Sequence, residues 1–253
     1  MISLLLAAAV LSGSEIARIE VPGQEAPAPH RPCVEIAAGA PVPVKVFFTA
    51  PPASPTFSFY RVAEKWTAPL VEDKEMPPDG DGFRAVLEIP AASIPQRYLL
   101  RVKGTGTPAD IDVVAYPANL PERLRRLTGA LSQSGGAVGV FGPGSTVKAL
   151  LRAWQVPYVD YDPYGRSVSI AVGDFIGHDL DGQKLPESAA ARTLFLTTAP
   201  QFDAPGDSVR AEAAGPRKTV FASGEDWSLL PTHPALQYRF LALFSQTLSP
   251  STP

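Results

Sequence analysis

The sequence is poor in cysteine and in charge. Its 253 residues include one cysteine, so no internal disulfide can form. Charged residues make up only 19% of the chain, the formal net charge is −3, and no block of like charges occurs. The chain therefore lacks a basic stripe for a nucleic acid backbone, and nucleic acid is excluded as a partner.

Proline, by contrast, is abundant. The chain has 28 prolines, and they cluster in stretches such as PAPHRP, APPASP and EMPPDGDG. Such clusters mark loops, which favours a β-rich domain with short strands between them. With 45% hydrophobic residues the chain is globular, and its length suits two domains that each bury a core.

The first residues have the character of an export signal. MISLLLAAAVLSGS is an apolar stretch that ends in small residues, although no Lys or Arg precedes it. We expect a signal peptide over residues 1–14 and a secreted or periplasmic protein. The stretch is too short to span a bilayer, so the mature chain should contain no transmembrane segment. A buried N-terminal strand or helix is the alternative.

Residues 15–117 show the two-residue alternation of β-strands. The runs are IARIEV, VPVKVFF, TFSFYRV, FRAVLEI, RYLLRV and IDVVAY. They predict an all-β sandwich that resembles an immunoglobulin-like or fibronectin-type domain. The resemblance implies that Trp66 is a core aromatic and that Tyr98 is the corner tyrosine. We expect Cys33, before the second strand, to be a small buried hydrophobe.

Asp79-Gly80-Asp81-Gly82 has the composition of a hairpin turn. Calcium binding is the alternative, because carboxylates are ligands for hard cations.

Helical spacing begins at residue 118. Over residues 118–134 four leucines fall on one face and Pro121 suits a first turn; the leucines are Leu120, Leu124, Leu127 and Leu131. We expect a connecting helix. Its arginines, which are Arg123, Arg125 and Arg126, form either a solvated face or an anion site.

Strands and helices alternate over residues 135–248. Strands are predicted at 137–141, 158–162, 169–172, 193–197 and 219–222, with helices at 145–154 and 235–248. This order predicts a small α/β domain with an open, mostly parallel sheet, nearest to the flavodoxin-like form. The DPYGR link is too short for a crossover helix, so that connection is irregular or that strand pair antiparallel. Residues 249–253 are a tail.

Two short motifs of this domain resemble the class I glutamine amidotransferases. That family has a Gly-x-Cys-x-Gly elbow after a central strand and a His-Pro-Glu before the final helix. Here the corresponding stretches are Gly173-Asp174-Phe175-Ile176-Gly177 and Thr232-His233-Pro234-Ala235. The resemblance implies that Phe175 replaces the nucleophile and Ala235 the carboxylate, so that His233 alone is retained. A histidine at a helix start or in the core is the other interpretation of His233.

Three groups of residues are candidates for ligand binding. Gly142, Gly144, Ser145 and Thr146 form a strand-to-helix corner that either holds an anion or only turns the chain. Asp174, His178, Asp179 and Asp181 follow the central strand, where they form a surface loop, a metal site or an acid–base site. Glu225, Asp226 and Trp227 should line a polar pocket with an aromatic wall at the same edge.

The missing nucleophile favours a non-catalytic secreted or envelope protein. In this interpretation a sandwich and a degenerate amidotransferase-like domain act in binding or assembly, with an unidentified protein or small-molecule ligand and no cofactor. The alternative is a hydrolase that uses Asp174, His178, Asp179 and Asp181, with or without a metal, in which Asp174, His178 and His233 are the catalytic candidates.

Overall fold

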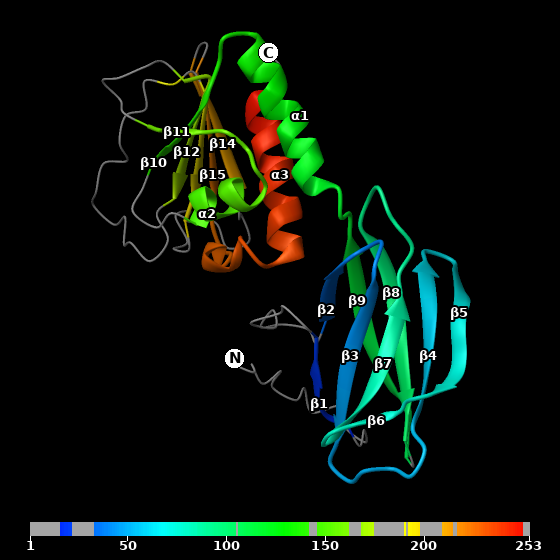
Figure 1. Cartoon of the computed structure of the whole chain (residues 1–253). Coiled ribbons are helices and arrows are strands. Elements are labelled where there is room, and N and C mark those ends of the chain that lie inside the picture. The colour runs from blue at the N-terminus through cyan, green and yellow to red at the C-terminus, as the bar shows by residue number, and fades with distance from the viewer. Residues whose placement is uncertain are drawn as a thin grey trace. The chain divides into compact units, whose positions relative to one another are not determined.

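The computed structural model describes residues 16–21, 33–104, 106–141, 146–161, 168–174, 190, 192–197, 209–214 and 217–249. The chain divides into two compact units, Met1–Ala118 and Asn119–Pro253. We describe each unit by itself (Figure 1). The predicted signal peptide lies outside the described residues.

The first unit consists of two β-sheets (Figure 1). One sheet has the order β1-β3-β7-β6 and is antiparallel throughout. The other has the order β2-β9-β8-β4-β5, and only its β2–β9 pair is parallel. The strands are β1 (Ile16–Glu20), β2 (Cys33–Ala37), β3 (Pro41–Phe48), β4 (Thr56–Ala63), β5 (Trp66–Glu75), β6 (Pro78–Asp79), β7 (Gly82–Glu88), β8 (Gln96–Lys103) and β9 (Ala109–Tyr116).

A single core fills the space between these sheets. Alternate residues along β2, β8 and β9 are buried; in β8 these are Tyr98, Leu100 and Val102. Val44, Val46 and other residues of the first sheet belong to the same buried cluster. The rings of Phe59 and Tyr98 stack with centroids 5.1 Å apart. An all-β first unit is therefore confirmed.

Trp66 is not the core aromatic that the sequence predicts. It is the first residue of β5, and 53% of its surface is exposed. Phe57, Phe59 and Tyr98 fill the core instead. The strand pattern also missed β5 and β2. Cys33 precedes the predicted strand VPVKVFF, which is β3, as expected, but it also begins the unpredicted strand β2. β5 carries a proline and a charged end, which weaken its strand signal.

The Asp79–Gly82 stretch forms a hairpin turn, as predicted. Asp79 pairs with Gly82, which leaves Gly80 and Asp81 as a two-residue loop between β6 and β7. Gly80 has φ +62°, the conformation that the first central position of a type II′ turn requires. The Asp81 carboxylate lies 3.0 Å from the Lys45 ammonium. The turn is thus held by hairpin geometry and an ion pair.

The second unit has a six-stranded sheet with the order β11-β10-β12-β13-β15-β14 (Figure 1). All neighbouring pairs are parallel except β14–β15, so a mostly parallel sheet is confirmed. The elements are α1 (Leu120–Gln133), β10 (Val138–Phe141), α2 (Thr146–Ala153), β11 (Val159–Asp160), β12 (Ile170–Asp174), β13 (Arg192–Leu196), β14 (Val209–Ala214), β15 (Arg217–Ala222), the 3₁₀ turn η1 (Trp227–Leu229) and α3 (Pro234–Leu248).

The strand order reverses at β10. Both β11 and β12 pair with β10 and run parallel to it. The antiparallel alternative for the β11 and β12 segments is therefore wrong, because the two strands are separated by β10 and point the same way. In open sheets of this kind, ligands gather at the carboxyl ends of the strands where the order reverses.

The three described helices pack into one core with one face of the sheet. Leu120 and Leu124 of α1 are buried, and Leu127 and Leu131 pack at its margin, as the leucine spacing predicts. Pro121 lies in the first turn of the helix. α1 lies beside α3 within the second unit, so it is part of that unit's helical layer (Figure 1).

Candidate functional site

The parallel strands of the second sheet share one carboxyl edge, and the candidate residues come shortly after these strands in the sequence. The parallel strands end there at Phe141, Asp160, Asp174, Leu196 and Ala222. Ligands of open α/β sheets bind outside this edge. The position of each predicted residue relative to the edge therefore decides what the edge can do.

The glycine corner after β10 is only partly placed. Gly142, Gly144 and Ser145 lie outside the described residues, whereas Thr146 begins α2. The nearby Lys148 ammonium lies 2.6 Å from the Asp160 carboxylate at the end of β11. This hydrogen bond lowers the pKa of Asp160 below its usual value. Lys148, in the first turn of α2, thus neutralises the carboxylate of Asp160 at the end of β11. Anion binding by the glycine corner stays a prediction.

The acidic loop is placed only at its first residue. Asp174 ends β12 and pairs in register with Leu196 of β13. His178, Asp179 and Asp181 lie outside the described residues, as does Phe175. Within the described ranges, no three His, Cys, Asp or Glu side chains come close enough together to hold a metal ion. A metal or acid–base role for the loop stays a prediction.

Glu225 and Asp226, two of the candidates that follow β15, have structural roles. Glu225 forms an ion pair with Arg239 of α3. Asp226 is the N-cap of η1, where its carboxylate accepts a hydrogen bond from the Ser228 N–H at 3.1 Å.

Trp227 is 0% exposed and belongs to the core, so it does not form the predicted aromatic wall of a pocket. The large apolar area of an indole explains its burial. The Trp227 Nε1–H has no hydrogen bond partner in the described part of the chain.

His233 is at the start of α3. It is the N-cap residue, with an extended backbone at φ −97° and ψ 113°. Its N–H donates to the Leu229 carbonyl at 2.9 Å, and its carbonyl accepts from Gln237 at 3.0 Å. His233 therefore lies at a helix start, and a role as a retained base stays a prediction. Ala235 lies in the first turn and offers no carboxylate to orient an imidazole.

Cys33, the only thiol of the chain, lies in the first unit. It begins β2 and is half-buried. Burial raises the pKa of the Cys33 thiol to about 11, and the negative charges of Glu35 and Asp112 add to this effect. At neutral pH the thiol is protonated, so it is a poor nucleophile.

The sequence did not predict a row of aromatic rings near the carboxyl edge. Ring centroids are 5.4 Å apart for Tyr161 and Phe141, 5.4 Å for Phe141 and Phe195, and 5.2 Å for Phe195 and Phe221. Gly173 lies in this row, because a Cβ there would be 2.6 Å from Phe141 and 2.8 Å from Phe195. The first glycine of the elbow motif therefore has a packing role. The signal for it was the phenylalanine near the end of several predicted strands.

No family model matches the chain, and no curated protein matches it. Several solved structures are similar to part of it, among them the following two. An NMR structure of a protein from Bacteroides thetaiotaomicron is 11% identical, over 39% of this chain and 84% of that one, with a TM-score of 0.26. A crystal structure of a sialyltransferase from Photobacterium damsela is 8% identical, over 65% of this chain and 35% of that one, with a TM-score of 0.25. Likenesses this weak do not bear on fold or function.

None of the described helices is both long enough and apolar enough to cross a membrane.

Proposed function

We propose that the protein is a non-catalytic secreted or envelope protein that acts in ligand binding or assembly. Its first unit is an immunoglobulin-like sandwich, and its second unit is a degenerate relative of the amidotransferases. The observation that carries this proposal is the state of Cys33. Burial raises the pKa of its thiol to about 11, and the residue belongs to a different unit from the amidotransferase-like motifs.

The topology of the second unit supports the alignment of its two motifs with the elbow and the His-Pro-Glu of the amidotransferases. In chain order the five parallel strands are arranged 2-1-3-4-5, the order of flavodoxin-like sheets. The elbow-like stretch begins at the end of β12, which has parallel neighbours on both sides. His233 directly precedes the final helix α3. In this register the elbow position is Phe175, whose side chain has no proton that a base can remove.

The roles of the residues after β15 also support a non-catalytic function. Glu225 neutralises Arg239, and Asp226 caps η1. A general acid or base must reach the substrate. Carboxylates engaged in an ion pair and a helix cap are poorly suited to that task.

Hydrolysis assays on the purified full-length protein test the proposal. We expect no release of ammonia from glutamine and no hydrolysis of p-nitrophenyl acetate above a heat-denatured control, with or without Zn²⁺ or Mg²⁺. A glutaminase that iodoacetamide inhibits and that Cys33→Ser abolishes would overturn the proposal. Metal-dependent hydrolysis that His178→Ala abolishes would overturn it in favour of the hydrolase.

Export is the second part of the proposal. Mass spectrometry of the protein from its native host should show loss of about the first 14 residues, because small residues follow the apolar stretch as at a processing site. An intact Met1 in a cytoplasmic fraction would contradict export.

A further inference from the structure

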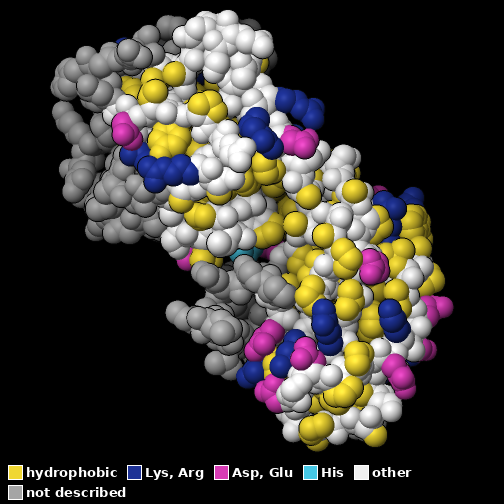
Figure 2. Space-filling view, viewed as in Figure 1, with side chains coloured by type: hydrophobic (Ala, Val, Ile, Leu, Met, Phe, Trp, Pro, Cys, Tyr) yellow, Lys and Arg dark blue, Asp and Glu magenta, His cyan; other side chains and the backbone are white. Residues whose placement is uncertain are grey.

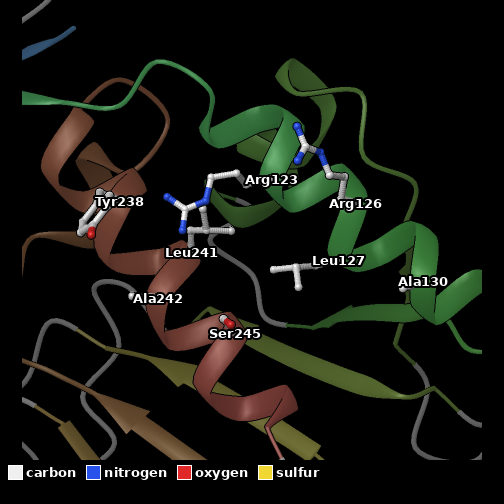
Figure 3. Close-up of a pocket in the computed structure, with 8 residues that line it drawn as sticks. All are labelled: Arg123, Arg126, Leu127, Ala130, Tyr238, Leu241, Ala242 and Ser245. Atoms are coloured by element: carbon white, nitrogen blue, oxygen red, sulfur yellow. The ribbon is translucent and has the colours of Figure 1, made fainter. Parts of the chain in front are cut away.

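A groove runs between α1 and α3 on the helical layer of the second unit (Figure 3). Its volume is about 470 Å³, within the range of small-molecule sites. α1 contributes Arg123, Arg126, Leu127 and Ala130, and α3 contributes Tyr238, Leu241, Ala242 and Ser245. This groove is separate from the carboxyl edge of the sheet, which carries the other candidate residues.

Helical periodicity and small side chains create the groove. Arg123, Leu127 and Ala130 repeat at spacings of four and three, as do Tyr238, Ala242 and Ser245, so each set follows one face of its helix. The alanines leave room between the helices where longer side chains would meet. Leu241 is 3% exposed and Leu127 is half-buried, so the interior of the groove is apolar.

The rim of the groove is cationic. In Figure 3 the Arg123 side chain reaches from α1 toward Leu241 of α3. Arg123 has no ion-pair partner among the residues that the structure places. Arg126 has a single weak one, Glu122, at 3.6 Å and with both side chains largely exposed. None of the described residues that line the groove is acidic.

The two helices together have four arginines and one acidic residue, Glu122, although the whole chain has a formal net charge of −3. Figure 2 shows Lys and Arg side chains over α1 beside exposed hydrophobic atoms.

α3 is unusually apolar for a helix in an outer layer. Its only charged residue is Arg239, and Glu225 neutralises it. The partly exposed residues Ala235, Tyr238, Ala242 and Ser245 carry no charge. Helices at a protein surface normally turn charged residues to water. The combination of an apolar groove and an arginine rim suits a ligand with an apolar body and an anionic head.

We propose that this groove binds a single-chain amphiphile with an anionic head group. The Arg123 and Arg126 guanidiniums, one helical turn apart, bind the head by charge-assisted hydrogen bonds. The chain lies along Leu127 and Leu241, with Ala130 and Ala242 providing the space. From Arg123 to Ala130 the groove covers about two helical turns, or ~10 Å. That length holds about eight carbons of an extended aliphatic chain, so the end of a longer chain extends past Ala130, and it is too short for a stable interface with a partner helix. This proposal is independent of whether the protein is catalytic.

Isothermal titration calorimetry of the full-length protein with laurate below its micellar concentration tests the proposal. We expect saturable one-to-one binding. Acetate lacks the apolar chain, and dodecyltrimethylammonium has the same chain with a cationic head that cannot bond the guanidiniums. Each should bind at least about tenfold more weakly, since two buried CH₂ groups or one charge-assisted hydrogen bond are worth roughly a factor of ten. Arg123→Gln should weaken laurate binding by a similar factor.

Arg125→Gln is the matched control, because Arg125 lies in the same helical turn but does not line the groove. We expect it to leave laurate affinity unchanged. Ala242→Leu should abolish binding by filling the groove. Ala130→Leu is a second filling variant at an exposed position, in case Ala242→Leu disturbs packing with α1; thermal melts show which variants are folded.

Equal losses in Arg123→Gln and Arg125→Gln would overturn the proposal, because they would indicate attraction to net charge alone. Unchanged binding in a folded groove-filling variant would also overturn it. So would binding only to vesicles of phosphatidylglycerol, which would indicate a membrane surface in place of a dissolved amphiphile.

Discussion

The sheets of the first unit and the groove of the second unit differ in how fully their charged side chains are paired. In the first unit, Arg101 pairs with Asp110 at 2.7 Å and Lys103 with Asp73 at 2.5 Å across strands. Lys45 of β3 pairs with Asp81 of the hairpin loop at 3.0 Å. On the helical layer of the second unit, Arg123 and Arg126 border an apolar groove without a strong partner. A surface whose charges neutralise one another has little attraction for a charged ligand, so the helical layer of the second unit is the better candidate for binding.

Removing one fully buried core aromatic from each unit should have the largest effect on stability. Phe59→Ala in the first unit and Trp227→Ala in the second each remove a fully buried ring, and each should cost about 3–5 kcal/mol. Because each ring belongs to a separate core, guanidinium unfolding followed by tryptophan fluorescence and circular dichroism should show one of two transitions shifted. Two equal shifts in each variant would show that the units unfold together.

Gly173→Ala should have the next largest effect on the free energy of unfolding. The new Cβ would lie 2.6 Å from Phe141 and 2.8 Å from Phe195, and such overpacking costs about 1–3 kcal/mol. The control is Gly129→Ala in α1, where a Cβ would meet nothing within 4 Å. That change should stabilise the helix by about 0.5–1 kcal/mol. Urea denaturation of both variants measures the difference, and an unaffected Gly173→Ala would contradict the packed aromatic row.

The Cys33 thiol should give the stability of the first unit a dependence on pH in the alkaline range. Burial raises the pKa of Cys33 from 9.0 to about 11, so folding favours the neutral thiol. Its contribution to stability is complete below pH 9 and decreases between pH 9 and about 11. At pH 8, iodoacetamide should alkylate the folded protein much more slowly than the urea-unfolded protein, as intact mass spectrometry can measure. Equal rates would contradict the raised pKa.

The smallest effects should come from single arginines. Arg101 donates two hydrogen bonds of 2.7 Å to Asp110, but both side chains are more than a third exposed. Solvent screening therefore limits the cost of Arg101→Gln to about 0.2–1 kcal/mol, less at high salt. Arg125→Gln breaks no ion pair in the described residues and should change stability by less than about 0.5 kcal/mol. Thermal melts at two salt concentrations compare them, and a larger loss for Arg125 would reverse the expectation.

Much of the fold was readable because the first unit alternates and the second unit shows clear helical spacing. The strands around Leu100 and Val113 alternate buried and solvent-facing residues, and the leucines of α1 repeat at helical intervals. β14 was missed because VRAEAA has short or charged side chains and a weak strand preference. It is nevertheless a strand because β15 supplies its hydrogen bonds.

The candidate site was less predictable because contacts with residues far away in the sequence decide the role of each of its side chains. The sequence places Glu225 and Asp226 beside Trp227, which suggested a common pocket. It does not show that Arg239, one turn into α3, neutralises Glu225, or that the indole turns into the core. The groove between α1 and α3 was also not predicted, since it depends on which faces of two helices far apart in the sequence meet.

The exposed strand β5 has a consequence for self-association. It is the last strand of its sheet in the described part of the chain, where exposed backbone donors and acceptors invite another molecule to extend the sheet. Pro69 has no N–H to offer, and Glu72, Asp73, Lys74 and Glu75 place charges along the same edge. Asp73 has φ +43°, which interrupts the regular backbone of the strand. The proline and the charged end, which weaken the strand signal of β5 in the sequence, thus protect the folded protein against fibre growth from this edge.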